Sequence, residues 1–433
     1  MNKFKNNILF RNILILLISG AISKIIGMIG KITYTRIAGV NIVSLYALIT
    51  PTMMLIITIV QFSFPISISK LSAEGKYKNC DLLKSSHLIA IIINIILIII
   101  ISLSSKSIAN MLHNKALYKI ILSIIPIIPF VSITSVQRGF LHGKEDMMPA
   151  GISNIVEEIV KILLIIIILP IFTKKNNIIA IICLILFNII TEIISMIIMG
   201  KVINNKYIKD NKGTIKKDII KDIISISLPT TLVRLISSIG FFLEPIILTN
   251  ILLKTGYTLN YITLEYGIIN SYIIPLLSVP SFFSISIASA LLPNITKAYS
   301  NKKYKEFDNK LLKLMILSLI VGMICLIFIM IMPGKILTII YNVNYGINYI
   351  YLIGPFFLIL YMQPTLSVAM QAMNKTNYLF IVSIISIIIK YTILMISGLM
   401  GVGMNSLIYS IITGIIVTTS LMIYIILSES KRR

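Results

Sequence analysis

Ser23–Gly30 reads SKIIGMIG, and Val233–Gly240 reads VRLISSIG. The two stretches match, and each places one cation, Lys24 or Arg234, near the middle of a long apolar segment. A cation at the midplane of a bilayer costs roughly 3 kcal/mol on insertion scales. We therefore expect a duplicated membrane protein in which the repeated cation has a function. An anionic cargo is the simplest reason to retain it.

The composition predicts an all-α membrane protein. Of the 433 residues, 57% are hydrophobic and only 12% are charged, and the mean hydropathy is +0.97. Charge clusters separate about twelve apolar runs, each of roughly the 17–25 residues that a helix needs to cross ~30 Å of hydrocarbon. The expected spans are 13–32, 45–64, 88–103, 118–136, 152–172, 178–199, 223–243, 268–288, 311–331, 347–370, 378–396 and 407–427.

The basic residues sort by loop. The formal net charge is +24, but a nucleic-acid interface requires a soluble basic face, so nucleic acid is not an expected partner. Alternate loops hold about 26 and about nine Lys and Arg residues. The positive-inside rule then places both termini in the cytoplasm of a multi-pass plasma-membrane protein.

An internal repeat predicts two six-helix lobes, residues 1–200 and 223–433, joined by a cytoplasmic linker at 201–222. The second span of each lobe carries a matched proline, Pro51 or Pro275. An even number of spans makes the lobes parallel repeats. Because proline bends helices, these two positions are the expected hinges.

The first helix carries Lys24 on one stripe with Gly20, Ser23, Gly27 and Lys31. One interpretation is a cationic face that lines a cavity. The other is a small-residue packing face with Lys31 reaching the outer headgroups. The candidate substrate-binding cations are Lys24, Lys31, Arg36, Arg234 and Lys390.

Four glutamates in the spans are candidates for coupling to a proton or cation: Glu157, Glu158, Glu192 and Glu244. The spacing of Glu157, Glu158 and Lys161 also fits a locally neutralised ion pair. Lys390 has no acidic neighbour in the sequence and is either a third cavity cation or the partner of one of these glutamates.

Signatures of enzymes and metal sites are missing from the sequence. The three His and three Cys residues lack metal-ligand spacing, and there is no phosphate-binding glycine loop or nucleophile elbow. The outside loops are about fifteen residues at most, which is short for a catalytic domain. We therefore expect a protein that is not an enzyme, with no cofactor and no metal.

Three stretches carry a resemblance to a known family: Ser23–Gly27 with Tyr46–Glu74, Gln137–Gly143 with Met148–Glu158, and Leu228–Pro229 through Pro293. Together they resemble the stage V sporulation protein B family of polysaccharide transporters. The resemblance implies the multidrug, oligosaccharidyl-lipid and polysaccharide (MOP) flippase superfamily, in which two MATE-like six-helix lobes alternate between inward and outward openings. Its lipid II flippases carry cavity cations on the first helix, where Lys24, Lys31 and Arg36 lie here. Many relatives have fourteen spans, so twelve spans count against lipid II itself. The expected substrate is then another undecaprenyl-pyrophosphate-linked glycan or a precursor of the spore envelope, such as a spore cortex precursor or a polysaccharide unit.

The hypothesis is a flippase for a polyprenyl-pyrophosphate-linked saccharide, with membrane lipids and a coupling cation or proton as further partners. Lys24 and Arg234 would hold the diphosphate, because ammonium and guanidinium groups suit phosphate oxygens. The alternative with the same architecture is a MATE-type multidrug or cation antiporter, whose cavity should be acidic. A glycan polymerase or ligase would need a larger outside loop, and a membrane scaffold would leave the paired cations unexplained.

Overall fold

The computed structural model describes residues 2–208 and 213–430. The regular secondary structure of these residues consists of helices joined by turns and loops, as predicted. The described part of the chain thus omits the centre of the predicted linker, 209–212, and the basic residues 431–433.

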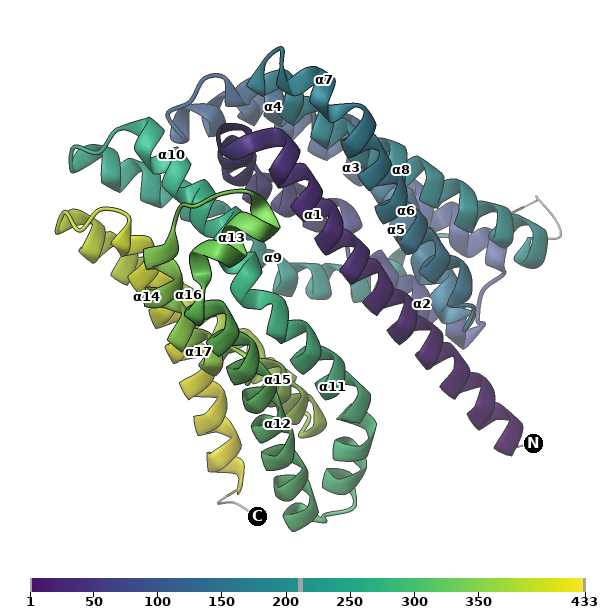
Figure 1. The fold of residues 1–433 in the computed structure, drawn as a ribbon. Coiled ribbons are helices and arrows are strands. Elements are labelled where there is room, and N and C mark those ends of the chain that lie inside the picture. Colours follow the sequence, from purple (N-terminus) through teal and green to yellow (C-terminus); the bar gives the residue numbers. More distant parts are fainter. Residues whose placement is uncertain (1, 209–212, 431–433) are drawn as a thin grey trace. The chain divides into compact units, whose positions relative to one another are not determined.

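Contacts divide the chain into two compact units, Met1–Phe242 and Leu243–Arg433. The first unit contains the elements α1 (Asn2–Gln61), α2 (Phe64–Glu74), α3 (Asn79–Met111), α4 (Leu117–Leu122), η1 (Ile125–Ile127), α5 (Ile128–Gly143), α6 (Met148–Ile167), α7 (Leu169–Thr173), α8 (Asn177–Tyr207) and most of α9 (Lys217–Lys254) (Figure 1).

The second unit contains the rest of α9 and the elements α10 (Leu259–Gly267), η2 (Ile268–Ile273), α11 (Ile274–Ser300), α12 (Tyr304–Ile331), α13 (Pro333–Tyr341), α14 (Ile347–Leu360), α15 (Gln363–Ala372), α16 (Thr376–Leu399) and α17 (Asn405–Ser430). The boundary between the units falls inside α9. The linker predicted at residues 201–222 includes the end of α8 and the start of α9.

Every predicted span lies on helical segments. Within the described residues, ten helical ranges are long and apolar enough to cross a membrane. One of them, Ser19–Glu74, covers the first two predicted spans, and α6, which carries Glu157, Glu158 and Lys161, is outside the ten. These two differences account for the gap between ten and the predicted twelve.

The helix α1 is interrupted at Gly39, between the first two predicted spans. Gly39 has φ 74° and ψ 167°, a conformation that is essentially restricted to glycine. The helix (purple in Figure 1) changes direction along its length. Pro51 lies within the second part of α1, and Pro275 lies in the first turn of α11, directly after the π-helical η2. Their roles as hinges remain predictions.

The surface of both units is rich in exposed aliphatic and aromatic side chains, such as Leu103 and Phe328 at 77% and 70% exposure. A soluble protein rarely shows apolar patches of this extent. In a bilayer, the lipid tails solvate such side chains. Each unit also has a buried core, built around Phe64 and Phe140 in the first and Phe307 and Met370 in the second.

Candidate functional site

The cations of α1 lie beside a packing face. The hydroxyl of Ser23 donates to the carbonyl oxygen of Asn154 on α6 at 3.5 Å, and a Cβ added to Gly27 would lie 3.2 Å from the Glu158 carboxyl carbon. Ser23 and Gly27 of the predicted stripe therefore serve the packing of α1 on α6, whereas a Cβ added to Gly20 would meet no described atom within 4 Å. Lys24 and Arg36, by contrast, are exposed, and Lys31 is half-buried.

Arg234 lies on α9 and belongs to the same compact unit as Lys24. Its Nη2 donates to Gln61 Oε1 at 2.7 Å, which uses one of the five guanidinium N–H donors. Serine and threonine side chains hold this part of α9 in the first unit through hydrogen bonds at Ser227–Ser67, Thr231–Ser63 and Ser238–Thr58. The Arg234 guanidinium is thus positioned and half-buried.

A second group of polar side chains, which we call the first-unit cluster, consists of Thr134, Arg138, Glu157 and Glu192. Arg138 Nη2 lies 3.5 Å from Glu157 Oε1, and the hydroxyl of Thr134 donates to Glu192 Oε2 at 2.7 Å. Arg138 Nε and Glu157 Oε1 are buried and make no hydrogen bond with the described residues. The cluster therefore holds two carboxylates beside one guanidinium, and the Lys161 ammonium also interacts electrostatically with both carboxylates. The hydrogen bonding of the cluster is incomplete.

The partner of Glu157 corrects one expectation. The ion pair joins Glu157 of α6 to Arg138 of α5 rather than to Lys161 on its own helix. The predicted fourth span ended at residue 136, which placed Arg138 in a loop, whereas α5 continues to Gly143. A longer helix carries the guanidinium into the bundle. The apolar run could not reveal this, because hydropathy falls where the polar residues Gln137 and Arg138 begin.

The second-unit pair consists of Glu244 on α9 and Lys390 on α16. The Lys390 ammonium donates to Glu244 Oε2, and the hydroxyl of Tyr266 lies 3.4 Å from Glu244 Oε1. The side chains of Glu244 and Lys390 are 5% and 18% exposed. Of the two predicted roles of Lys390, the structure supports the partner of a glutamate.

Three ion pairs, which we call the linker clamps, hold the two ends of the predicted linker within the first unit. Lys76 and Tyr77 both contact Asp222 Oδ2, at 3.1 and 2.7 Å. Lys206 and Tyr207 contact Asp146 Oδ2 in the same way, at 2.7 and 2.9 Å, and Lys216 lies 2.7 Å from Asp81. Hydrogen bonding to Tyr77 and to Asp222 raises the pKa of Lys76 above its usual value.

Metal ligands are not clustered in the described residues. No group of three or more His, Cys, Asp or Glu side chains is arranged to hold an ion there. The cysteines Cys80, Cys183 and Cys325 are free thiols.

The sequence matches two known families. Residues 9–299 match the family described as "Polysaccharide biosynthesis protein", and residues 269–396 match the family described as MatE. The chain is 28% identical over 426 residues to stage V sporulation protein B of Bacillus subtilis (strain 168), which covers 94% of this chain and 81% of that protein. It is 25% identical over 229 residues to capsular polysaccharide biosynthesis protein CapF of Staphylococcus aureus, and this match covers 52% of this chain and 53% of that protein.

Solved structures share the fold at low sequence identity. An inward-facing multidrug resistance MATE family transporter of the MOP superfamily superposes with a TM-score of 0.71 at 16% identity, covering 94% of this chain and 96% of that one. A MOP superfamily transporter from Pyrococcus furiosus, described as having a binding pocket of reverse polarity, superposes with a TM-score of 0.63 at 13% identity and covers 98% and 95%. This multi-pass plasma-membrane protein has the fold of MOP superfamily transporters, and its chain belongs to the polysaccharide biosynthesis protein family.

Proposed function

We propose that this protein is a flippase that moves a polyprenyl-pyrophosphate-linked saccharide from the cytoplasmic to the outer leaflet of the plasma membrane. The observation that carries the proposal is the exposure of the Lys24 side chain. This side chain is exposed on a membrane helix on which Ser23 and Gly27 are already used for packing against α6. An exposed ammonium within an apolar span is costly and suits an anionic ligand.

Lys24 and Arg234 would together bind the diphosphate, with Lys31 and Arg36 of α1 as further contacts for it. Guanidinium and ammonium groups form short, charge-assisted hydrogen bonds with phosphate oxygens. Gln61 orients the Arg234 guanidinium and leaves most of its N–H donors for such bonds. The polyprenyl tail would remain in the bilayer, so that only the polar head group crosses the membrane.

The family and its relatives support a saccharide substrate. The matched family is described as polysaccharide biosynthesis protein, and two relatives are named for sporulation and for capsular polysaccharide. With both termini in the cytoplasm, as the loop charges predict, an inside-negative potential favours outward movement of the diphosphate. Each elementary charge contributes about 2.3 kcal/mol per 100 mV. The glutamates Glu157, Glu158 and Glu192 of the first unit are candidates for binding a coupled proton or cation.

A flipping assay in proteoliposomes tests the proposal. We expect Lys24→Ala and Arg234→Ala each to reduce transport of a polyprenyl-pyrophosphate-linked sugar by about tenfold, the effect of losing one charge-assisted hydrogen bond. Lys24→Arg keeps the charge and should retain most transport. Lys335→Ala, which removes an exposed lysine of α13, serves as the control. Unchanged transport in the Lys24→Ala/Arg234→Ala double variant would refute the diphosphate role.

A MATE-type multidrug or cation antiporter is the second candidate. The MatE match over residues 269–396 and the two carboxylates of the first-unit cluster favour it. A lipophilic cation would seek these acids rather than Lys24. Drug susceptibility of a deletion strain separates the candidates, because an antiporter deletion sensitises the cell to lipophilic cations, whereas a flippase deletion leads to accumulation of lipid-linked sugar.

A further inference from the structure

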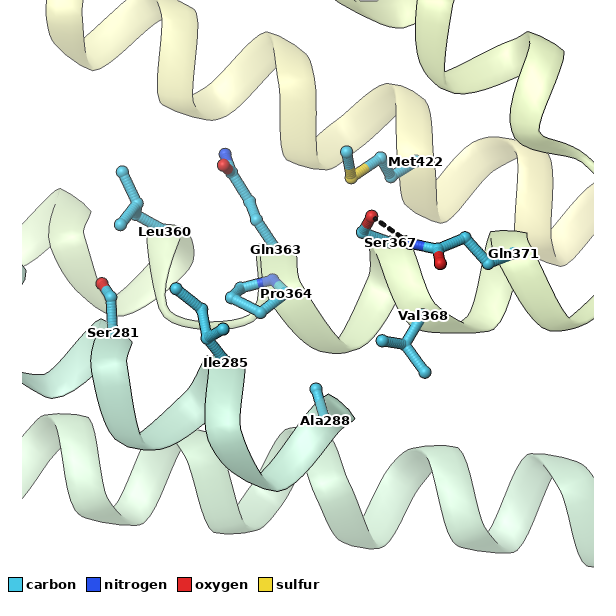
Figure 2. Close-up of a pocket in the computed structure, with 10 residues that line it drawn as sticks. All are labelled: Ser281, Ile285, Ala288, Leu360, Gln363, Pro364, Ser367, Val368, Gln371 and Met422. Atoms are coloured by element: carbon cyan, nitrogen blue, oxygen red, sulfur yellow. Dashed lines mark hydrogen bonds between the residues drawn. The ribbon is translucent and has the colours of Figure 1, made fainter. Parts of the chain in front are cut away.

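The second unit contains a cavity of about 480 Å³ between α11, α15 and α17. Figure 2 shows side chains of α11 rising toward this space from one side and Met422 of α17 bordering it on the other, with the lining side chains of α15 between them. The volume is within the range typical of small-molecule sites.

The polar groups that line the cavity in the described part of the chain are all uncharged. They are the hydroxyls of Ser281 and Ser367 and the amides of Gln363 and Gln371. Gln363, Ser367 and Gln371 are four residues apart and therefore share one face of α15, as Figure 2 shows. Amides and hydroxyls both donate and accept hydrogen bonds, which matches a ligand rich in hydroxyl groups.

The two glutamines are oriented by bonds that use their N–H groups. Gln363 Nε2 donates to Thr419 Oγ1 at 3.0 Å, and Gln371 Nε2 donates to Ser367 Oγ at 3.3 Å. Within the described residues, neither amide oxygen accepts a hydrogen bond from the protein. Two acceptors are therefore available to the hydroxyl or amide groups of a ligand.

Ser281 points to a ligand most directly. The residue is only 8% exposed, its Oγ has no hydrogen-bond partner in the described part of the chain, and it lines the cavity. A buried hydroxyl without a partner is unfavourable. This oxygen has almost no accessible surface, so a ligand in the cavity supplies the missing partner once the Ser281 side chain rotates toward it.

The remaining lining excludes other ligand classes. Ile285, Ala288, Val368 and Met422 provide apolar surface that suits the C–H faces of a sugar ring. Among the described residues, no acid lines the cavity to attract a lipophilic cation, and no base lines it to bind a phosphate. A lipid tail would leave the four polar side chains without new partners. The chemistry that fits is an uncharged, hydroxyl-rich group.

One of the equivalent positions in the first unit is charged. When Thr365–Ala372 (TLSVAMQA) is written beneath Val136–Gly143 (VQRGFLHG), Ser367 falls under Arg138. Continuing the same register, Ser383–Lys390 (SIISIIIK) falls beneath Asn154–Lys161 (NIVEEIVK), which aligns the two lysines. The repeat thus carries a guanidinium in one unit and a hydroxyl in the other. This difference favours charge handling in the first unit and neutral recognition in the second.

We infer that this cavity receives the uncharged sugar of the lipid-linked substrate through Ser281, Gln363, Ser367 and Gln371. The inference rests on the proposed function and adds where, and by which groups, the saccharide is recognised. It separates sugar recognition from diphosphate binding, so the two can fail independently.

Binding to the purified full chain in lipid nanodiscs tests the inference. The chain contains no tryptophan, so Leu360→Trp places a single tryptophan on the cavity wall, and its emission can be excited separately from that of the tyrosines. Met400→Trp, at a residue that is 75% exposed after α16, provides a reporter away from the lining. The probes are undecaprenyl pyrophosphate with one N-acetylglucosamine and undecaprenyl pyrophosphate without sugar.

We expect the sugar-bearing probe to shift the emission of Leu360→Trp, but not that of Met400→Trp, and to bind about tenfold more tightly than the sugarless probe, as one or two added hydrogen bonds would give. Ser281→Ala and Gln371→Leu should each lower the affinity for the sugar-bearing probe by about three- to tenfold and leave the affinity for the sugarless probe unchanged. Ser286→Ala, on the same helix and outside the lining, is the matched control and should change neither.

Three results would overturn the inference. The first is equal affinity for the two probes, and the second is an equal loss of affinity for both probes in Ser281→Ala. The third is an emission shift of Leu360→Trp that is as large with the sugarless probe as with the sugar-bearing probe. Failure of the diphosphate role looks different. In that case Lys24→Ala and Arg234→Ala would leave the sugarless probe unaffected, while the cavity variants would still discriminate between probes. Melting temperatures of all variants, compared with the parent chain, identify any loss that comes from unfolding.

Discussion

The two units hold their buried charges in different ways. The second-unit pair joins one carboxylate to one ammonium, with Tyr266 beside it, and the Glu244 side chain is 5% exposed. The first-unit cluster places two carboxylates near one guanidinium, and its ion pair is 3.5 Å long without a hydrogen bond. The pair is closed and neutral, which suits a structural role. The cluster retains unsatisfied groups, which suits binding and release of a proton or cation.

Breaking the second-unit pair should have the largest effect. Lys390→Met leaves Glu244 buried without its cation, and removal of one partner of a buried pair costs about 3–5 kcal/mol. Thermal unfolding of the purified protein in detergent measures the loss. Lys335→Met, at an exposed position, controls for the substitution itself.

The double variant Glu244→Met/Lys390→Met sharpens the result. Because apolar replacement of a whole buried pair is often nearly neutral, the double variant should recover most of the stability. A Lys390→Met variant as stable as the parent would show that the pair is not closed as described.

Breaking the first-unit cluster should have a smaller effect on stability and a larger one on transport. Glu157 is 20% exposed and makes a long ion pair, so Glu157→Gln should cost less than about 1 kcal/mol. If this carboxylate binds the coupled ion, transport driven by an ion gradient should fall by about tenfold in Glu157→Gln. Glu74→Gln, at an exposed residue ending α2, is the control. Destabilisation as large as in Lys390→Met would remove the contrast between the two units.

The linker clamps supply the smallest expected effect, because Lys76 is solvated. The pKa of Lys76 is raised above its ordinary value of 10.5 by Tyr77 and Asp222. A raised lysine pKa contributes stability that is fully present below the ordinary value and is lost as the pH rises through the higher folded value. The difference in melting temperature between the parent and Lys76→Met should therefore be constant up to about pH 10 and shrink above it. Lys70→Met, at an exposed lysine of α2, should show no such profile.

The helices could be predicted from sequence because the hydrocarbon core acts on each residue locally. Every predicted span lies on helical segments, and the break between the first two falls at Gly39, the glycine whose backbone interrupts α1. Segment ends were harder to predict. The polar dipeptide Gln137-Arg138 lowers the hydropathy of the fourth span, yet α5 continues through it, and this continuation creates the first-unit cluster.

The amino-acid sequence by itself determined that this is a membrane protein and where its helical segments lie. It also determined the repeated cations Lys24 and Arg234 and the resemblance to polysaccharide transporters. These follow from composition, apolar run length and repetition, which are properties of short stretches. Only the tertiary structure decided that Lys390 pairs with Glu244, that Glu157 pairs with Arg138, and that Ser281, Gln363 and Gln371 line one cavity. Such partners lie on different helices, and their meeting depends on how the helices pack, which no local pattern of hydropathy or charge specifies.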